Sequence, residues 1–148
     1  HWPFCVAKCP YCDFNSHVRD SVDEAEWQAA LLADLRYEAA MLPDRKISSI
    51  FFGGGTPSLM PPATVAALIA EADRLWGLTD ACEITLEANP NSVEVANFAA
   101  LAAAGVNRVS IGVQSFERQA LEFLGRAHDA DEARRAIAEA SAALEPTI

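Results

Sequence analysis

The 148-residue sequence has few cationic side chains and no long apolar run, and both shortages exclude classes of protein. Its 11 Lys and Arg residues stand against 21 Asp and Glu residues, for a formal net charge of −10. Binding to a phosphate backbone needs clustered Lys and Arg, so we expect no nucleic-acid partner. No uninterrupted apolar stretch reaches the roughly 20 residues of a membrane helix, so we predict no membrane span. A secretory leader pattern is also absent, and we expect a cytoplasmic protein.

Cysteine is scarce as well, yet three of the four cysteines, Cys5, Cys9 and Cys12, lie together in a Cys-x3-Cys-x2-Cys pattern. Disulfides are disfavoured because nothing directs the chain to an oxidising compartment. Three thiolates on one short loop can hold three corners of a 4Fe-4S cluster and leave the fourth iron open to a ligand that is not protein. The alternative is structural zinc, which needs a distant fourth ligand. The candidates for that ligand are Cys82, His17 and His128. We interpret the triad as cluster ligands and Cys82 as an ordinary buried thiol.

The sequence has no low-complexity tract or charged linker, and its length fits one ordinary domain with a sizeable core. It opens without an initiating methionine, with the cysteine loop already under way. It stops at 146–148, where a further strand could start. We therefore expect a fragment of a longer protein.

Short apolar segments alternate with helical patterns along the chain. A capping-box spacing at Ser21 and Glu24, followed by apolar residues every four positions, predicts a helix that ends at Leu42. The predicted strands cover 47–52, 83–88 and 108–114, and the helices that follow cover 61–77, 92–105, 120–124 and 131–144, with Ser92 as a cap. Repeated units of this length predict parallel strands joined by right-handed helical crossovers.

Side-chain alternation within the strands predicts one apolar and one polar face of the sheet. In strand 83–88, Ile84 and Leu86 alternate with Glu83, Thr85 and Glu87. Polar side chains gathered on one face suit a wide, incompletely closed barrel whose interior holds a ligand. The predicted fold is therefore α/β, a partial (β/α) barrel. Sites in such barrels lie at the carboxyl ends of the strands, where the glycine run 53–55, Glu87 and Gln114 are expected.

Five segments, in this order, resemble the radical S-adenosylmethionine (SAM) superfamily. They are the cysteine loop with Tyr11, Gly53-Gly54-Gly55-Thr56-Pro57-Ser58, Glu87-Ala88-Asn89-Pro90, Gly112-Val113-Gln114-Ser115-Phe116 and Leu124-Gly125-Arg126-x-His128. More narrowly, they resemble the oxygen-independent coproporphyrinogen III oxidase family and its haem-chaperone branch. Phe14 favours that branch, because the decarboxylating oxidases typically carry a further cysteine at its position. The resemblance implies that residues 1–148 are the N-terminal part of a radical SAM core domain, with the remaining strands and a C-terminal domain absent.

The resemblance implies a cofactor chemistry and a set of contacts. SAM would chelate the open iron, and one electron from the cluster would cleave it to release a 5′-deoxyadenosyl radical. Cys5, Cys9 and Cys12 would bind the metal. The residues that would contact SAM are Tyr11, Gly54, Gly55, Thr56, Glu87, Gln114 and Arg126. Arg126 suits the methionine carboxylate because a guanidinium can bind it bidentately; a surface role for Arg126 and a packing role for Tyr11 are the alternatives.

The function that the resemblance implies is haem binding and delivery to acceptor proteins, with SAM cleavage in a supporting role. The alternative is an enzyme that oxidatively decarboxylates coproporphyrinogen III. The implied partners are haem or porphyrin, a haem-acceptor protein, and an electron donor such as a flavodoxin or ferredoxin. His17 and His128 are candidate haem ligands, although an isolated polar histidine is more often a hydrogen-bonding residue.

Overall fold

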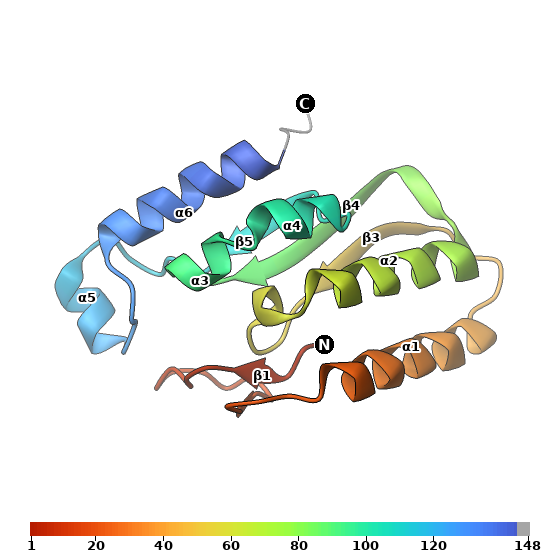
Figure 1. The fold of residues 1–148 in the computed structure, drawn as a ribbon, viewed down its shortest axis with the longest axis horizontal. Helices are drawn as coiled ribbons and strands as arrows, with labels where there is room; N and C mark the ends of the chain where they lie inside the picture. The colour runs from red at the N-terminus through yellow and green to blue at the C-terminus, as the bar shows by residue number, and fades with distance from the viewer. Residues whose placement is uncertain (145–148) are drawn as a thin grey trace.

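The computed structural model describes residues 1–144, which form two parallel sheets and the helices that connect their strands (Figure 1). The larger sheet has the order β3 (Ile47–Phe52), β4 (Leu78–Ala88) and β5 (Arg108–Ile111). The smaller sheet pairs β1 (Phe4–Cys5) with β2 (His17–Val18). The helices are α1 (Glu24–Met41), the 3-10 turn η1 (Pro57–Leu59), α2 (Pro62–Trp76), α3 (Ser92–Val95), α4 (Phe98–Ala103), α5 (Arg118–Phe123) and α6 (Ala130–Ala143).

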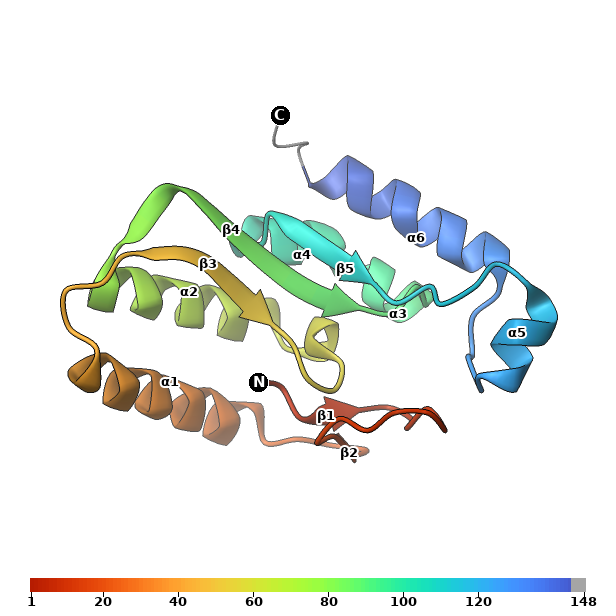
Figure 2. The ribbon, with the colours of Figure 1, turned by 180° about the vertical axis from the view of Figure 1, so that it is seen from behind.

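Helices cover only one face of the larger sheet. In Figure 1, α2, α3 and α4 lie in front of the strands and α6 lies beyond the β5 edge, and in the view from behind (Figure 2) the described helices leave the strands uncovered. The buried side chains of β4 are Cys82, Ile84, Leu86 and Ala88, which alternate along the strand and face the helices. The open face carries Glu83 and Glu87 from β4 and the exposed ring of Phe51 from β3. The predicted split between an apolar and a polar face is confirmed for β4, whereas β3 adds the aromatic ring of Phe51 to the polar face.

Thr85 is the exception on the open face, because its side chain is fully buried. Its hydroxyl donates to Glu83 Oε1 at 3.0 Å and accepts from Arg108 Nη1 at 3.3 Å. The two charged side chains therefore cover the threonine, and the polar face is shielded locally by its own residues.

Several predicted boundaries were wrong. Helix α1 is capped by Asp23, whose carboxylate accepts the Glu26 amide at 3.0 Å, and not by a Ser21 box. Strand β4 starts at Leu78 instead of residue 83, so the buried Cys82 lies within the strand and not at its start. The helix predicted for 92–105 is divided into α3 and α4, because the Asn97 amide donates to Glu94 O in a turn that interrupts the helical ladder.

Strand β5 ends at Ile111, three residues before the predicted end, because the backbone turns sharply after it. The amides of Val113 and Ser115 each donate to the carbonyl two residues earlier, and Gln114 between them has φ 64°. Strand β3 and helices α2, α5 and α6 agree with the prediction within about two residues. No helix in residues 1–144 combines the length and apolar character needed to cross a membrane.

Candidate functional site

The cysteine loop between β1 and β2 lies beside the carboxyl end of β3, and the glycine loop 53–55 joins the two. The Trp2 amide donates to Gly53 O at 2.9 Å, the Gly55 amide to Trp2 O at 2.6 Å, and the Thr56 amide to Phe4 O at 2.8 Å. Residues 2–5 thus run along the glycine loop in the manner of a parallel strand. This pairing fixes the start of the cysteine loop at the mouth of the sheet.

Glycine is required in this loop because the two backbones approach closely. A Cβ on Gly55 would lie 2.6 Å from Phe4 O, and one on Gly54 would lie 2.7 Å from Trp2 O. Gly54 also has φ +122°, a conformation that other residues rarely adopt. The space that these glycines leave is filled by the chain itself, so their role in the structure is to seat the cysteine loop. Their predicted contacts with SAM stay predictions.

Each thiol of the loop has a polar neighbour of its own. Thr56 Oγ1 donates to Cys5 Sγ at 3.5 Å, Arg126 Nη1 donates to Cys9 Sγ at 3.3 Å, and Ser16 Oγ lies 4.0 Å from Cys12 Sγ. Cys5 is buried, Cys9 and Cys12 are half-buried, and all are free thiols. Donors directed at sulfur stabilise the negative charge of a thiolate or of a cluster that thiolates hold. The set therefore fits an iron-sulfur cluster.

The three thiols do not form a site for a single metal ion in the described residues. Within residues 1–144, no group of three His, Cys, Asp or Glu side chains is arranged to hold a metal ion. The structure therefore brings the loop to the sheet and supplies donors to its sulfurs. Thiolates that hold a 4Fe-4S cluster each bind a different iron, so they need not share one metal ion. The fourth ligands considered for zinc belong to no such group either, within the described part of the chain.

Arg126, in the segment between α5 and α6, connects the cysteine loop to the ends of β4 and β5. Its Nη1 donates to Cys9 Sγ and, at 3.4 Å, to Tyr11 Oη. Its Nη2 donates to Asn89 Oδ1 and to Gly112 O, both at 2.7 Å. Its Nε is buried and has no acceptor among the described residues. A buried unpaired donor is costly, so this atom is available to a ligand oxygen.

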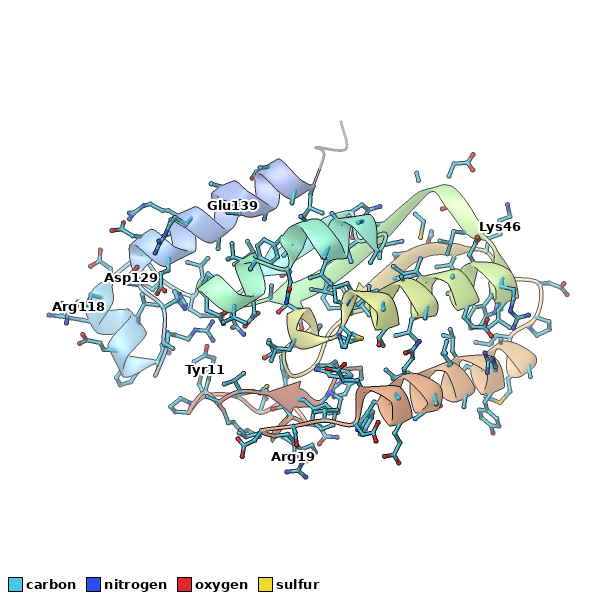
Figure 3. The ribbon with its side chains drawn as sticks, viewed as in Figure 1. Tyr11, Arg19, Lys46, Arg118, Asp129 and Glu139 are labelled. Carbon is cyan, nitrogen blue, oxygen red and sulfur yellow. The ribbon has the colours of Figure 1, made fainter. Side chains whose placement is uncertain are left out.

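Tyr11 projects from the cysteine loop toward the segment that carries Arg126 (Figure 3). Burial raises the pKa of its hydroxyl, while the Arg126 guanidinium acts in the opposite direction. The phenol therefore stays protonated at neutral pH and can donate a hydrogen bond while it accepts one from Arg126.

The other two predicted SAM contacts, Glu87 and Gln114, also lie at strand ends. Glu87 Oε2 accepts the Gly54 amide at 3.2 Å, so this carboxylate lies beside the glycine loop. Gln114 adopts the left-handed backbone region at φ 64°, which is uncommon for a residue with a long side chain. A Cβ on Gly112 would lie 3.2 Å from Gln114 Nε2 and 3.5 Å from Arg126 Nη2, so both side chains reach the end of β5. A strained residue at such a place is a reason to expect function.

The two histidines have different surroundings. His128 is buried, and its Nε2 lies 3.0 Å from Val113 O; because a carbonyl only accepts, the ring donates from Nε2. Burial lowers the pKa of His128 below its ordinary value. The hydrogen-bonding interpretation of His128 therefore accounts for its contacts. His17 lies exposed in β2.

Sequence reasoning missed Glu94 of α3, which is 1% exposed and lies close to the residues that follow β4. Its carboxylate accepts hydrogen bonds from Ser58 Oγ, from the Asn89 amide at 2.6 Å and from Asn91 Nδ2 at 2.6 Å. A signal was present in the sequence. Glu94 has helical spacing to Phe98 and Leu101, so an acidic residue stands on the face that packs in the core.

Comparisons with known proteins agree on one superfamily. The family model described as the Radical SAM superfamily matches residues 1–148. The chain is 46% identical over 142 residues to "Heme chaperone HemW" of Haemophilus influenzae, covering 93% of this chain and 37% of that protein. It is 44% identical over 140 residues to "Radical S-adenosyl methionine domain-containing protein 1, mitochondrial" of Bos taurus, covering 95% of this chain and 32% of that protein.

A solved structure is also similar: the coproporphyrinogen III oxidase HemN of Escherichia coli, whose title calls it a radical SAM enzyme. It superposes with a TM-score of 0.84 at 26% identity, covering 97% of this chain and 33% of that one. The predicted partial (β/α) barrel of the radical SAM type is confirmed by this match. The chain spans about a third of the length of the proteins it matches.

Proposed function

The chain belongs to the radical SAM superfamily, and from this premise we propose that it forms the cofactor-binding part of a haem chaperone. Membership implies a 4Fe-4S cluster and SAM. In the proposal, residues 1–148 are the N-terminal part of the radical SAM core domain, and the remaining strands and a C-terminal domain belong to the rest of the protein. The proposed cluster ligands are Cys5, Cys9 and Cys12.

The observation that carries the cofactor proposal is that separate elements supply donors to the cysteine loop. The hydroxyl of Thr56, after β3, donates to Cys5, and Arg126, before α6, donates to Cys9. When bound, the reduced cluster supplies one electron to the sulfonium of SAM. The protein's share is to stabilise the sulfur charge through these donors and to hold the loop against the glycine backbone.

The proposed SAM contacts use groups that point to the same end of the sheet. The Glu87 carboxylate accepts hydrogen bonds and suits ribose hydroxyls or an ammonium group. Arg126 offers the unpaired Nε donor to a carboxylate oxygen. Tyr11, Gly54, Gly55, Thr56 and Gln114 complete the proposed set, and each lies at the cysteine loop or at the carboxyl ends of β3 and β5.

The haem part of the proposal is supported by relatives named heme chaperones, at up to 46% identity. It is supported independently by Phe14, which stands where the oxidases typically carry a further cysteine. The proposed partners are haem, an acceptor protein for haem, and an electron donor such as a flavodoxin or ferredoxin. A cytoplasmic location remains part of the proposal.

Oxidative decarboxylation of coproporphyrinogen III is the second candidate, favoured by the structural similarity to the E. coli oxidase. The two functions make opposite predictions for the same sample. Full-length protein, reconstituted without oxygen and supplied with SAM and a reductant, is incubated in parallel with haem and with coproporphyrinogen III. We expect a stable haem complex in the absorption spectrum and no decarboxylated product by mass spectrometry. Conversion to protoporphyrinogen would replace the chaperone proposal with the oxidase, and absence of haem binding would reject it.

A further inference from the structure

A buried carboxylate lies behind the candidate site without touching it. Glu94 belongs to α3, and its side chain accepts from Ser58 Oγ, the Asn89 amide, Asn91 Nδ2 and, at 3.3 Å, Asn89 Nδ2. No ion pair joins it to a basic side chain in residues 1–144. Burying an acidic side chain without a cation is costly, and here the compensation comes entirely from neutral donors.

These bonds determine how the Asn89 side chain is turned. A carboxylate oxygen bonded to an amide group accepts from its nitrogen, so Glu94 Oε1 holds Asn89 Nδ2. The amide oxygen then faces the opposite way, where Asn89 Oδ1 accepts from Arg126 Nη2 at 2.7 Å. Glu94 thereby determines which end of this amide faces Arg126. The guanidinium meets the amide oxygen, an acceptor, and not the NH2 group, which is a donor.

The chain of contacts then continues to the cysteine loop. With Nη2 held by Asn89 and by Gly112 O, the guanidinium plane is fixed, and Nη1 points at Cys9 Sγ and Tyr11 Oη. Ser58, at the other side of Glu94, lies in η1, directly after the glycine loop. One buried side chain therefore joins the segments that follow β3 and β4 to the arginine that holds the loop.

We propose that Glu94 is a positioning residue, which turns the Asn89 amide so that Arg126 is aimed at the Cys9 sulfur. This inference rests on the proposed function in one respect, namely that Cys9 holds the cluster. Its effect is transmitted through Arg126, and it is this dependence that separates positioning from a general contribution to stability.

The decisive variant is Glu94→Gln, which keeps the shape of the side chain. It replaces one acceptor oxygen by an NH2 group, which would face the four groups that donate to Glu94. In full-length protein with its cluster, we expect a more negative cluster potential, because the donor to Cys9 is misaligned. Arg126→Ala is expected to shift the potential in the same direction. In the double variant the shift should equal that of Arg126→Ala alone, because the effect of Glu94 needs the guanidinium.

A second measurement does not need the cluster. In the full-length protein without metal, hydrogen exchange in the peptide covering 5–16 should be faster in Glu94→Gln and in Arg126→Ala than in the wild type. The double variant should exchange no faster than Arg126→Ala alone. Val65→Ala, a core substitution in α2, is the matched control; it should lower the melting temperature and leave the potential and the relative exchange of this peptide unchanged. Val65 is fully buried and lies outside these contacts.

The outcomes separate the inference from the function on which it rests. If the wild-type protein holds no cluster, the proposed function fails, and the exchange measurement still decides the role of Glu94. If a cluster forms and the two substitutions shift its potential additively, or if Glu94→Gln changes neither quantity, the positioning role is rejected and Glu94 is a structural residue.

Discussion

At the scale of single residues, the site depends on individual side chains that each donate a hydrogen bond to one cysteine sulfur. Cys5 and Cys9 receive hydrogen bonds from Thr56 and Arg126, which lie 51 and 117 positions away along the chain. Among the described residues, none donates a hydrogen bond to Cys82; burial raises the pKa of its thiol, so it remains protonated in the core. Thiols of the same chain therefore have distinct chemistry, decided by their surroundings.

The first prediction concerns these thiols. Cys5→Ala, Cys9→Ala and Cys12→Ala should each abolish the absorption of the cluster in anaerobically reconstituted protein, because three ligands are the minimum in the proposed site. Cys82→Ala is the control and should retain it. Iron and sulfide analysis is the measurement, and wild-type content in any of the first three variants would contradict the assignment.

The second prediction concerns the backbone of Gln114, which has φ 64°. Gln114→Gly should raise the free energy of unfolding by roughly 0.5–1 kcal/mol. Glycine relieves the strain of the left-handed backbone, and this gain exceeds the loss caused by the higher conformational entropy of the unfolded chain. It should also weaken SAM binding, since the amide is lost. Gln114→Ala separates the two effects: it loses the amide but keeps the strain. Equal unfolding free energies for the Gly and Ala variants, by urea denaturation, would show that the strain is absent.

At the scale of elements, an ion-pair cluster joins the two longest helices. Glu71 of α2 accepts from Arg36 of α1 at 2.6 Å and from Arg74 of its own helix at 2.7 Å. Hydrogen bonds from Arg74 and Arg36 lower the pKa of Glu71 from 4.5 to about 2. Helix α1 has no fully buried residue, so this polar contact contributes to its attachment.

The third prediction follows from the sign of that shift. Because the folded-state pKa of Glu71 is depressed, its contribution to the free energy of unfolding is complete above about pH 4.5. This contribution is lost as the pH falls toward 2. Glu71→Gln should therefore lower the melting temperature at pH 6 and have little effect near pH 2. Glu122→Gln, which breaks the exposed pair with Arg118 within α5, is the control and should have a small effect throughout. A difference in melting temperature between wild type and Glu71→Gln that stays constant across this pH range would contradict the depressed pKa.

The elements also show what a sequence can and cannot specify. Period-two alternation in 83–88 and the glycine run after β3 predicted the polar face and its loop, because both are local patterns. The early end of β5 follows from the turn in which the Val113 amide donates to Ile111 O, and the alternation in 108–114 does not mark this turn. Asp23 replaces Ser21 as the cap because only its carboxylate reaches the Glu26 amide. Contacts such as those of Glu94 and Arg126 join distant segments and became visible only when the chain was folded.

At the scale of the whole molecule, the cysteine loop is an attachment to the sheet and not part of it. It is held at its start by the glycine loop and at Cys9 and Tyr11 by Arg126. No three of its thiols or neighbouring acidic and imidazole groups form a metal site in the part of the chain that is described. In the proposed site, a bound cluster would be a further constraint on this loop.

The fourth prediction is that cluster removal loosens this attachment while the sheet stays intact. The cluster-loaded full-length protein should melt at a higher temperature than the metal-free form, because binding to the folded state alone is a stabilising contribution. The added hydrogen-exchange protection should be concentrated in 5–16, with β4 unchanged. Protection spread evenly over β3, β4 and β5 would mean that the whole fold, and not the loop, responds to the metal.

The aromatic side chains around the start of this loop have an optical consequence. Trp2 and Trp27 each pack edge-on against Phe4, at ring-centroid distances of 5.2 Å and 4.9 Å, and Phe4 directly precedes Cys5. The third tryptophan, Trp76, lies at the far end of α2, where its indole donates to Leu42 O. An iron-sulfur chromophore at Cys5 would quench the emission of the first pair more strongly than that of the third. Intrinsic fluorescence thus gives the protein a built-in reporter of its own metal loading, without any label.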